Sequence, residues 1–185
     1  MNEKTTRRKN LRVFTISLSF MAFAFGLFGP FYYIFINQIG GTIESFGIAT
    51  GLVVLSSSLV SLVAGKYSDK YGRKPFLIAG GYASAVIVFL YTMISSLWQL
   101  YLLQILNGLV VSMFHISETS FLADVTKKKN RGADIGTYNA VVGILEALAI
   151  FVGGFIAGKF GFDIVFYIVS VIFVMTTTLL LKVRE

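Results

Sequence analysis

The sequence contains no cysteine, a single histidine, two prolines and only nine acidic residues among its 185 positions. Without cysteine, disulfides and thiolate metal sites are excluded. A dedicated metal cluster is also not expected from one histidine and so few carboxylates, and we predict neither a metal nor a cofactor. Charged residues make up only 14% of the chain, well below the roughly one quarter that is typical of soluble domains.

Apolar residues make up 56% of the chain, and the mean hydropathy is +0.78. This composition favours a protein of the lipid bilayer. The net charge of +7 is compatible in principle with nucleic-acid binding, but the basic residues flank apolar segments and do not gather in one module. We therefore interpret the charge as a determinant of membrane orientation, with no nucleic-acid partner.

Six apolar segments follow a basic tail at residues 1–12. A helix rises about 1.5 Å per residue, so each segment has about the length needed to cross a hydrocarbon core of about 30 Å. We predict an all-α membrane protein with six transmembrane helices in one domain at 13–185, with spans at about 13–36, 46–64, 76–94, 100–122, 137–157 and 164–181.

The positive charges support the same division of the chain. With six spans, fifteen of the sixteen lysines and arginines fall on one side of the membrane and only Lys159 falls on the other. Because lysine and arginine are enriched in cytoplasmic loops, both termini are predicted to be cytoplasmic. The expected location is the plasma membrane, as a multi-pass protein.

A charged stretch separates the second and third apolar segments. We predict that residues 65–75 form a short turn at the membrane surface. The stretch fits the pattern G-x-x-x-D-[RK]-x-G-R-[RK], and the specified positions are Gly65, Asp69, Lys70, Gly72, Arg73 and Lys74. The pattern resembles the signature loop of major facilitator superfamily transporters, which is cytoplasmic and joins the second and third helices. The alternative is a basic turn that only sets orientation.

The resemblance implies the fold of one six-helix half of such a transporter, built from two inverted three-helix repeats. A short internal echo agrees with this, because Ala64-Gly65-Lys66 is repeated as Ala157-Gly158-Lys159. The family usually holds its solute between two halves. The second half is therefore expected either from the same gene, from a second copy of this chain, or from a separate chain.

A second charged turn resembles the family's loop after the fourth helix. There an aspartate is followed by an Arg-Gly pair, here Asp124 and Arg131-Gly132. In the family this aspartate can pair with the arginine of the signature loop. The resemblance thus implies a contact between Arg73 and Asp124, and with Asp69 the three residues would form a cytoplasmic latch.

The fourth apolar segment carries a polar face. On an ideal helix five side chains fall within a sector of roughly 120°: Gln104, Asn107, His115, Glu118 and Thr119. Because carboxylates facing lipid are costly, this face is expected to line the bundle interior or a water-filled cavity. Glu146 lies near the middle of the fifth segment. Gln104, Asn107, His115, Glu118 and Glu146 are our candidates for solute or proton binding; the alternative for each acid is a protonated carboxyl hydrogen-bonded within the bundle.

The first apolar segment contains Pro30 and many aromatic residues. Proline removes a backbone donor, so a kink is expected there. The aromatic residues serve either for packing and lipid contact or as an aromatic wall for an organic solute: Phe20, Phe23, Phe28, Phe31, Tyr32 and Tyr33.

These patterns together predict a secondary active transporter, or its amino-terminal half. It would move a small solute across the bilayer by alternating access, and proton-coupled efflux is one form to test. Gln104 stands where many proton-coupled members have an arginine, so coupling through that arginine is absent. The alternative is a non-transporting six-helix assembly or regulatory subunit. Enzymatic activity is not expected, because no nucleophile motif or metal-ligand set accompanies His115 and Glu118.

Overall fold

The computed structural model describes residues 3–126 and 131–182, and this part of the chain is helical throughout apart from short connections. Lys127, Lys128 and Lys129 of the second charged turn lie outside the described residues, as do both extreme ends. The elements are α1 (Glu3–Phe28), the short 3-10 helix η1 (Gly29–Phe31), α2 (Tyr32–Gln38), α3 (Ile43–Tyr71), α4 (Arg73–Tyr91), α5 (Leu97–Val125), α6 (Arg131–Phe160) and α7 (Phe162–Leu180).

Six segments of the described chain are long and apolar enough to cross a membrane, which confirms the all-α membrane fold. The first of these segments, Asn10–Gln38, is not one continuous helix. The turn η1, with Pro30 inside it, interrupts the segment between α1 and α2. Since proline cannot donate the next helical hydrogen bond, the break lies where the sequence predicts a kink.

The signature stretch differs from the predicted turn. The helix α3 continues through Asp69 and Lys70 and ends at Tyr71, and α4 begins two residues later at Arg73. Gly72 alone separates the two helices, with φ of 88°. A left-handed backbone is readily adopted by glycine, so one residue is enough to reverse the chain. All five charged residues of the stretch therefore lie in helices, near the end of α3 or at the start of α4, and not in a loop.

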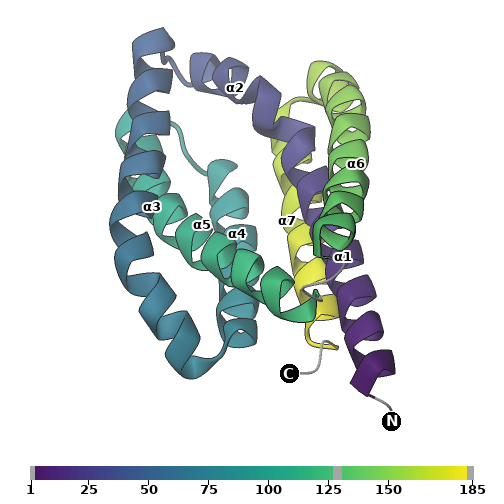
Figure 1. Cartoon of the computed structure of the whole chain (residues 1–185). Helices are drawn as coiled ribbons and strands as arrows, with labels where there is room; N and C mark the ends of the chain where they lie inside the picture. The colour runs from purple at the N-terminus through teal and green to yellow at the C-terminus, as the bar shows by residue number, and fades with distance from the viewer. Residues whose placement is uncertain (1–2, 127–130, 183–185) are drawn as a thin grey trace.

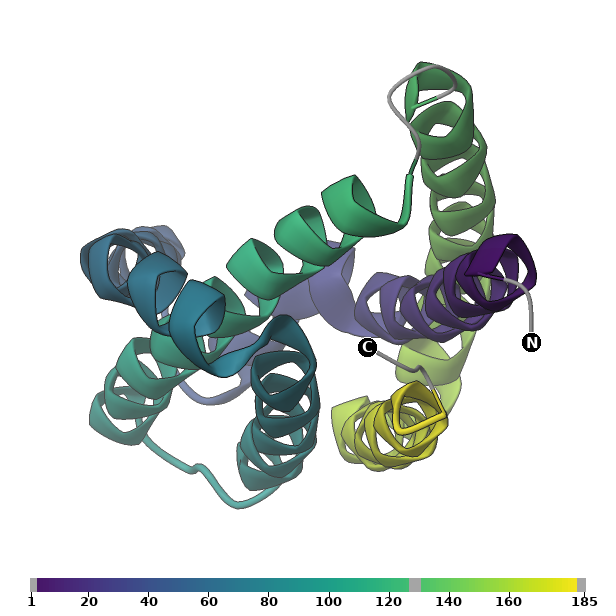
Figure 2. The ribbon, with the colours of Figure 1, turned by 60° about the horizontal axis from the view of Figure 1, so that its bottom comes forward.

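The helices form two groups of three, α3 with α4 and α5, and α1 with α6 and α7 (Figures 1 and 2). Inside these groups α3 packs along α5, and α1 packs along α6. The groups meet mainly where α4 packs against α7. The segment α2 reaches from the top of α1 towards α3 (Figure 1).

This packing confirms the two inverted repeats. The first repeat comprises α1 to α4 and the second comprises α5 to α7. The first long helix of each repeat packs on the second long helix of the other, as α1 with α6 and α5 with α3, while the third helices, α4 and α7, pack on each other. Exchange of partners in this way is expected of two repeats related by a two-fold axis. Each repeat crosses the membrane three times, so the two have opposite orientations.

The structure also corrects the register of the internal echo. Gly161 separates α6 from α7 just as Gly72 separates α3 from α4, with φ of 83° and 88°. The equivalent segments are thus Lys70-Tyr71-Gly72 and Lys159-Phe160-Gly161, four residues later in the first repeat than the sequence echo suggests. The sequence similarity at Ala64–Lys66 falls inside α3, away from the end of the helix. The glycine turns at Gly72 and Gly161 show which residues are equivalent in the two repeats.

Small residues allow the two closest helix pairs to approach. A Cβ atom at Gly108 of α5 would lie 2.5 Å from the carbonyl oxygen of Val53 in α3. A Cβ atom at Gly153 of α6 would overlap the carbonyl oxygen of Leu27 in α1. Within a bilayer such close packing is a main source of helix association, since lipid tails are as apolar as the side chains.

Candidate functional site

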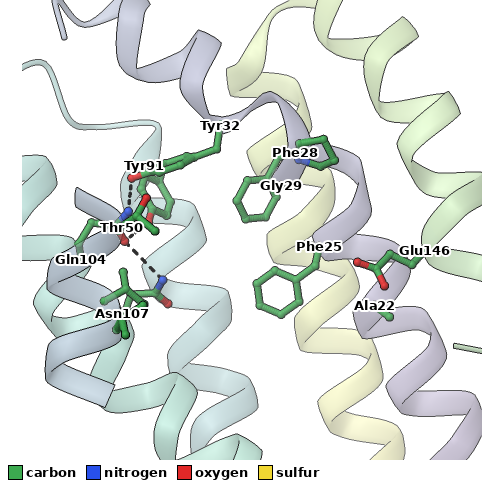
Figure 3. Close-up of a pocket in the computed structure, with 13 residues that line it drawn as sticks. Ala22, Phe25, Phe28, Gly29, Tyr32, Thr50, Tyr91, Gln104, Asn107 and Glu146 are labelled. Atoms are coloured by element: carbon green, nitrogen blue, oxygen red, sulfur yellow. Dashed lines mark hydrogen bonds between the residues drawn. The ribbon is translucent and has the colours of Figure 1, made fainter. Parts of the chain in front are cut away.

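A cavity of about 650 Å³ lies between the two groups of helices. Residues of α1, α3, α5 and α6 line it, together with η1, Tyr32 of α2 and Tyr91 of α4. Figure 3 shows polar side chains of α5 on one wall, and Phe25, Phe28 and Glu146 on the opposite wall. The volume is within the range of about 300–1,000 Å³ that is usual for small-molecule sites.

A hydrogen-bond network organises the polar wall. Gln104 is only 3% exposed, and its amide oxygen accepts a hydrogen bond of 2.9 Å from the hydroxyl of Tyr91. Its amide nitrogen donates to the hydroxyl of Tyr32. Asn107 donates to the same Gln104 oxygen over 3.4 Å. Gln104 is thus held by its neighbours, while the amide of the half-buried Asn107 has further donor and acceptor capacity towards the cavity.

The opposite wall combines aromatic rings with one carboxyl group. The ring centroids of Phe25 and Phe28 lie 6.0 Å apart, and Phe25 also meets Phe173 of α7 edge-on at 5.1 Å. Glu146 projects from the middle of α6 beside Ala22 of α1 (Figure 3). At this depth a carboxyl group must be solvated in the cavity, neutralised by a proton or paired with a cation.

The aromatic residues of the first segment serve both predicted roles, as a wall of the cavity and in packing between helices. Tyr32 and Phe28 line the cavity, and so does Phe25. Phe28 is at the same time 8% exposed and packs against the ring of Phe166 at 5.7 Å. The aromatic side chains therefore form one wall of the cavity and also attach α1 to α7.

Arg73 lies at the centre of the charged contacts at the other end of the bundle. Its guanidinium donates to the carboxylate of Asp124 at the end of α5, and to the carbonyl oxygen of Ser120 over 2.5 Å. Asp69 is more distant, at 3.4 Å from the guanidinium, and its side chain is 69% exposed. The contact between Arg73 and Asp124 that the resemblance implied is present, and it joins α4 to α5.

The other signature residues serve different contacts. Lys74 donates to the carbonyl oxygen of Leu181 just beyond α7 over 3.0 Å. The ammonium group of Lys70 lies 5.2 Å from the ring centroid of Tyr71. A Cβ atom at Gly65 would meet no atom of another described helix within 4 Å, so packing among these six helices does not explain a glycine there.

The polar face of the fourth segment is divided by the structure. Gln104 and Asn107 line the cavity, whereas Glu118 accepts a hydrogen bond from the hydroxyl of Tyr138 in α6. His115 is 74% exposed, with 3.9 Å between its ring nitrogen and Glu118. Helical spacing placed these residues on one side of α5, but the helix crosses the bundle and meets different neighbours at its two ends.

Tyr91 and Tyr138 are site residues that sequence reasoning missed. Tyr91 fixes Gln104, and Tyr138 holds Glu118. A buried tyrosine needs a partner for its hydroxyl, so tyrosines inside apolar segments were the available signal. Their partners lie on other helices, which the sequence alone does not pair.

Comparison with known proteins agrees with this architecture. The family model of the Major Facilitator Superfamily matches residues 14–185. The chain is 32% identical to the uncharacterized MFS-type transporter YitZ of Bacillus subtilis over 88% of its own length and 99% of that protein. It is 30% identical to the multi-drug resistance efflux pump PmrA of Streptococcus pneumoniae over 88% of its length, but over only 42% of that protein. Multidrug resistance protein MdtG of Dickeya zeae is 28% identical, with 89% of this chain and 41% of that protein covered.

The two inverted repeats, the cavity between the two groups of helices and the family match define a class, that of secondary membrane transporters. The chain belongs to the major facilitator superfamily. It spans nearly all of YitZ and about two fifths of PmrA and of MdtG. Membership of this family favours transport over both enzymatic activity and the non-transporting alternative.

Proposed function

We propose that this six-helix unit is one half of a secondary transporter that moves a small organic solute by alternating access. The observation that carries the proposal is the cavity of about 650 Å³ between the two groups of helices, to which both repeats contribute residues. Solute sites of transporters with inverted repeats lie at such repeat interfaces near the bilayer midplane. A second six-helix half completes the transport unit, supplied by the same gene, by a second copy or by a separate chain.

The chemistry of the cavity supports an amphipathic organic solute. Its lining is mostly apolar and aromatic, and Asn107 and Glu146 offer hydrogen bonding and negative charge on opposite walls. PmrA and MdtG are named as multidrug resistance proteins, which supports the same broad class for this chain, and the name of PmrA as an efflux pump supports export as the direction. Glu146 is the proposed site of proton exchange or of contact with a cationic group.

The charged contacts at the end of α5 support a latch. Arg73 attaches α4 to α5 through Asp124 and Ser120, so separating these helix ends requires all of these contacts to break. We propose that Arg73, Asp124 and, more weakly, Asp69 stabilise one of the two access states. A ligand or gradient changes the populations only by favouring one state over the other.

Transport by the purified protein in its native assembly tests this function. Proteoliposomes are loaded with buffer and given ethidium, an organic cation, outside. Saturable uptake is expected from transporters inserted with their cytoplasmic face outwards, and a second organic cation added outside should compete for it. A stable heteromeric complex with no saturable flux would instead support a regulatory subunit.

We further propose that the chain lies in the plasma membrane with both termini in the cytoplasm. The beginning of α1 and the end of α7 lie at the same end of the bundle (Figure 1), and the excess of basic residues favours the cytoplasm for that end. Because the chain has no cysteine, single introduced cysteines report their side directly.

Cysteine labelling in intact cells checks this orientation. A membrane-impermeant maleimide is expected to label Ser95→Cys, in the turn between α4 and α5, and not Lys70→Cys until the cells are opened. Labelling of Lys70→Cys in intact cells would contradict a cytoplasmic signature stretch.

A further inference from the structure

The outer surface of α3 has a feature that the cavity and the latch do not use. On an ideal helix six exposed residues of α3 fall within a sector of about 100°: Leu55, Leu59, Leu62, Val63, Lys66 and Lys70. The apolar members are strongly exposed, and Leu62 reaches 72%. The stripe therefore changes from apolar to positively charged as α3 approaches Gly72.

Two tyrosines border the charged end of this stripe. The rings of Tyr67 and Tyr71 are stacked, with centroids 6.0 Å apart and planes 9° from parallel. Both remain exposed, at 50% and 59%. Tyrosine is enriched where hydrocarbon meets headgroups, because its ring is apolar and its hydroxyl is polar. The pair thus marks the level of the membrane surface on α3.

Lys70 is a signature residue, yet it takes no part in the Arg73 contacts. It lies on the outward face, with its ammonium group over the Tyr71 ring. Asp69 borders the stripe on the opposite edge, where its carboxylate faces Arg73 at 3.4 Å. The positive charge of Lys66 and Lys70 is accordingly presented outwards, beside exposed apolar side chains.

We propose that Lys66, Lys70, Tyr67 and Tyr71 bind the headgroup of an anionic phospholipid, whose acyl chains lie along Leu62 and Val63. Charge complementarity selects this occupant, since two lysines attract a phosphate or other anionic headgroup. Lysines near an anionic membrane surface each contribute about fivefold in binding. A second copy docked symmetrically on the same face would bring these lysines against their own counterparts, which like-charge repulsion opposes.

Native mass spectrometry of the purified full chain tests this site. The protein is titrated with dioleoylphosphatidylglycerol or with dioleoylphosphatidylcholine, which differ in headgroup charge but share their acyl chains. We expect preferential retention of phosphatidylglycerol. Lys66→Gln with Lys70→Gln is expected to weaken that retention roughly 25-fold, with little change for phosphatidylcholine.

Lys159→Gln is the matched control. Lys159 is also exposed and lies 5.5 Å from the ring centroid of Phe160, but it occupies the equivalent turn of the other repeat. It is compared with Lys70→Gln, so that each protein loses one charge. Only Lys70→Gln should weaken phosphatidylglycerol retention, by about fivefold.

Several results would overturn the proposal. Equal retention of the two lipids by the unchanged protein excludes headgroup selection, and an equal effect of Lys159→Gln shows a response to net charge alone. If the charge-removing variants instead dissociate an assembly, the stripe is a protein interface. Phosphatidylglycerol retention by the unchanged protein must also fall as ammonium acetate is raised, because salt screens exposed charges; this measurement needs no variant.

Discussion

Replacing Asp124 with asparagine is expected to lower transport about tenfold while membrane insertion is retained. Hydrogen bonds to charged groups contribute about 1.5–3 kcal/mol, and about 1.4 kcal/mol corresponds to a tenfold change in an equilibrium. The Arg73 side chain is 26% exposed and that of Asp124 is 59% exposed, so solvent screens the pair and we take the lower end of this range; the guanidinium is also anchored on the Ser120 carbonyl oxygen. Its loss should shift the populations of the two access states. Initial ethidium flux in proteoliposomes measures the effect.

Two variants of the same contacts serve as controls. Asp124→Glu keeps the charge and should retain most of the transport. Asp69→Asn should have a smaller effect, about two- to threefold, because this carboxylate lies farther from Arg73, at 3.4 Å. Normal transport by Asp124→Asn, or a larger loss from Asp69→Asn, would contradict the proposed latch.

Glu146→Gln is expected to abolish stimulation of transport by a proton gradient. Among the described residues that line the cavity, Glu146 alone carries a carboxyl group. Glutamine has nearly the same shape but no titratable proton. Solute exchange with no gradient should persist if the amide still allows binding. The measurement is ethidium flux at equal pH on both sides and with a pH difference imposed.

Glu118→Gln is the matched control for Glu146. Glu118 lies on α5 and is held by the Tyr138 hydroxyl, outside the cavity lining. Its replacement should leave the response to the proton gradient in place. If stimulation by the gradient survives in Glu146→Gln but disappears in Glu118→Gln, then Glu118, which is hydrogen-bonded to Tyr138, is the coupling residue and Glu146 is not.

Much of the fold follows from local sequence properties. Apolar segment length determines the number of spans, and Pro30 determines the break after α1. The end of α3 was wrongly predicted because charged residues at a membrane surface can remain helical. Only the backbone of Gly72 shows where the helix stops.

The sequence predicted cavity residues correctly only where their position within a single helix was enough to identify them. Gln104 and Asn107 share one side of α5, and both line the cavity. The partners Tyr32 and Tyr91 come from other helices, and their contacts depend on how those helices cross. His115 shows the same limit, because its position on the polar side of α5 did not place it at the cavity.

Access of water to Asn107 tests the central claim most directly. The chain has no cysteine, so Asn107→Cys and Leu106→Cys can be compared in nanodiscs with a water-soluble maleimide. Asn107 lines the cavity, whereas its neighbour Leu106 is 48% exposed on another side of the helix. Maleimide requires a hydrated thiolate, so Asn107→Cys should react about tenfold faster and be protected by ethidium. Faster reaction at Leu106→Cys, with no protection at Asn107→Cys, would contradict a solute cavity between the two groups of helices.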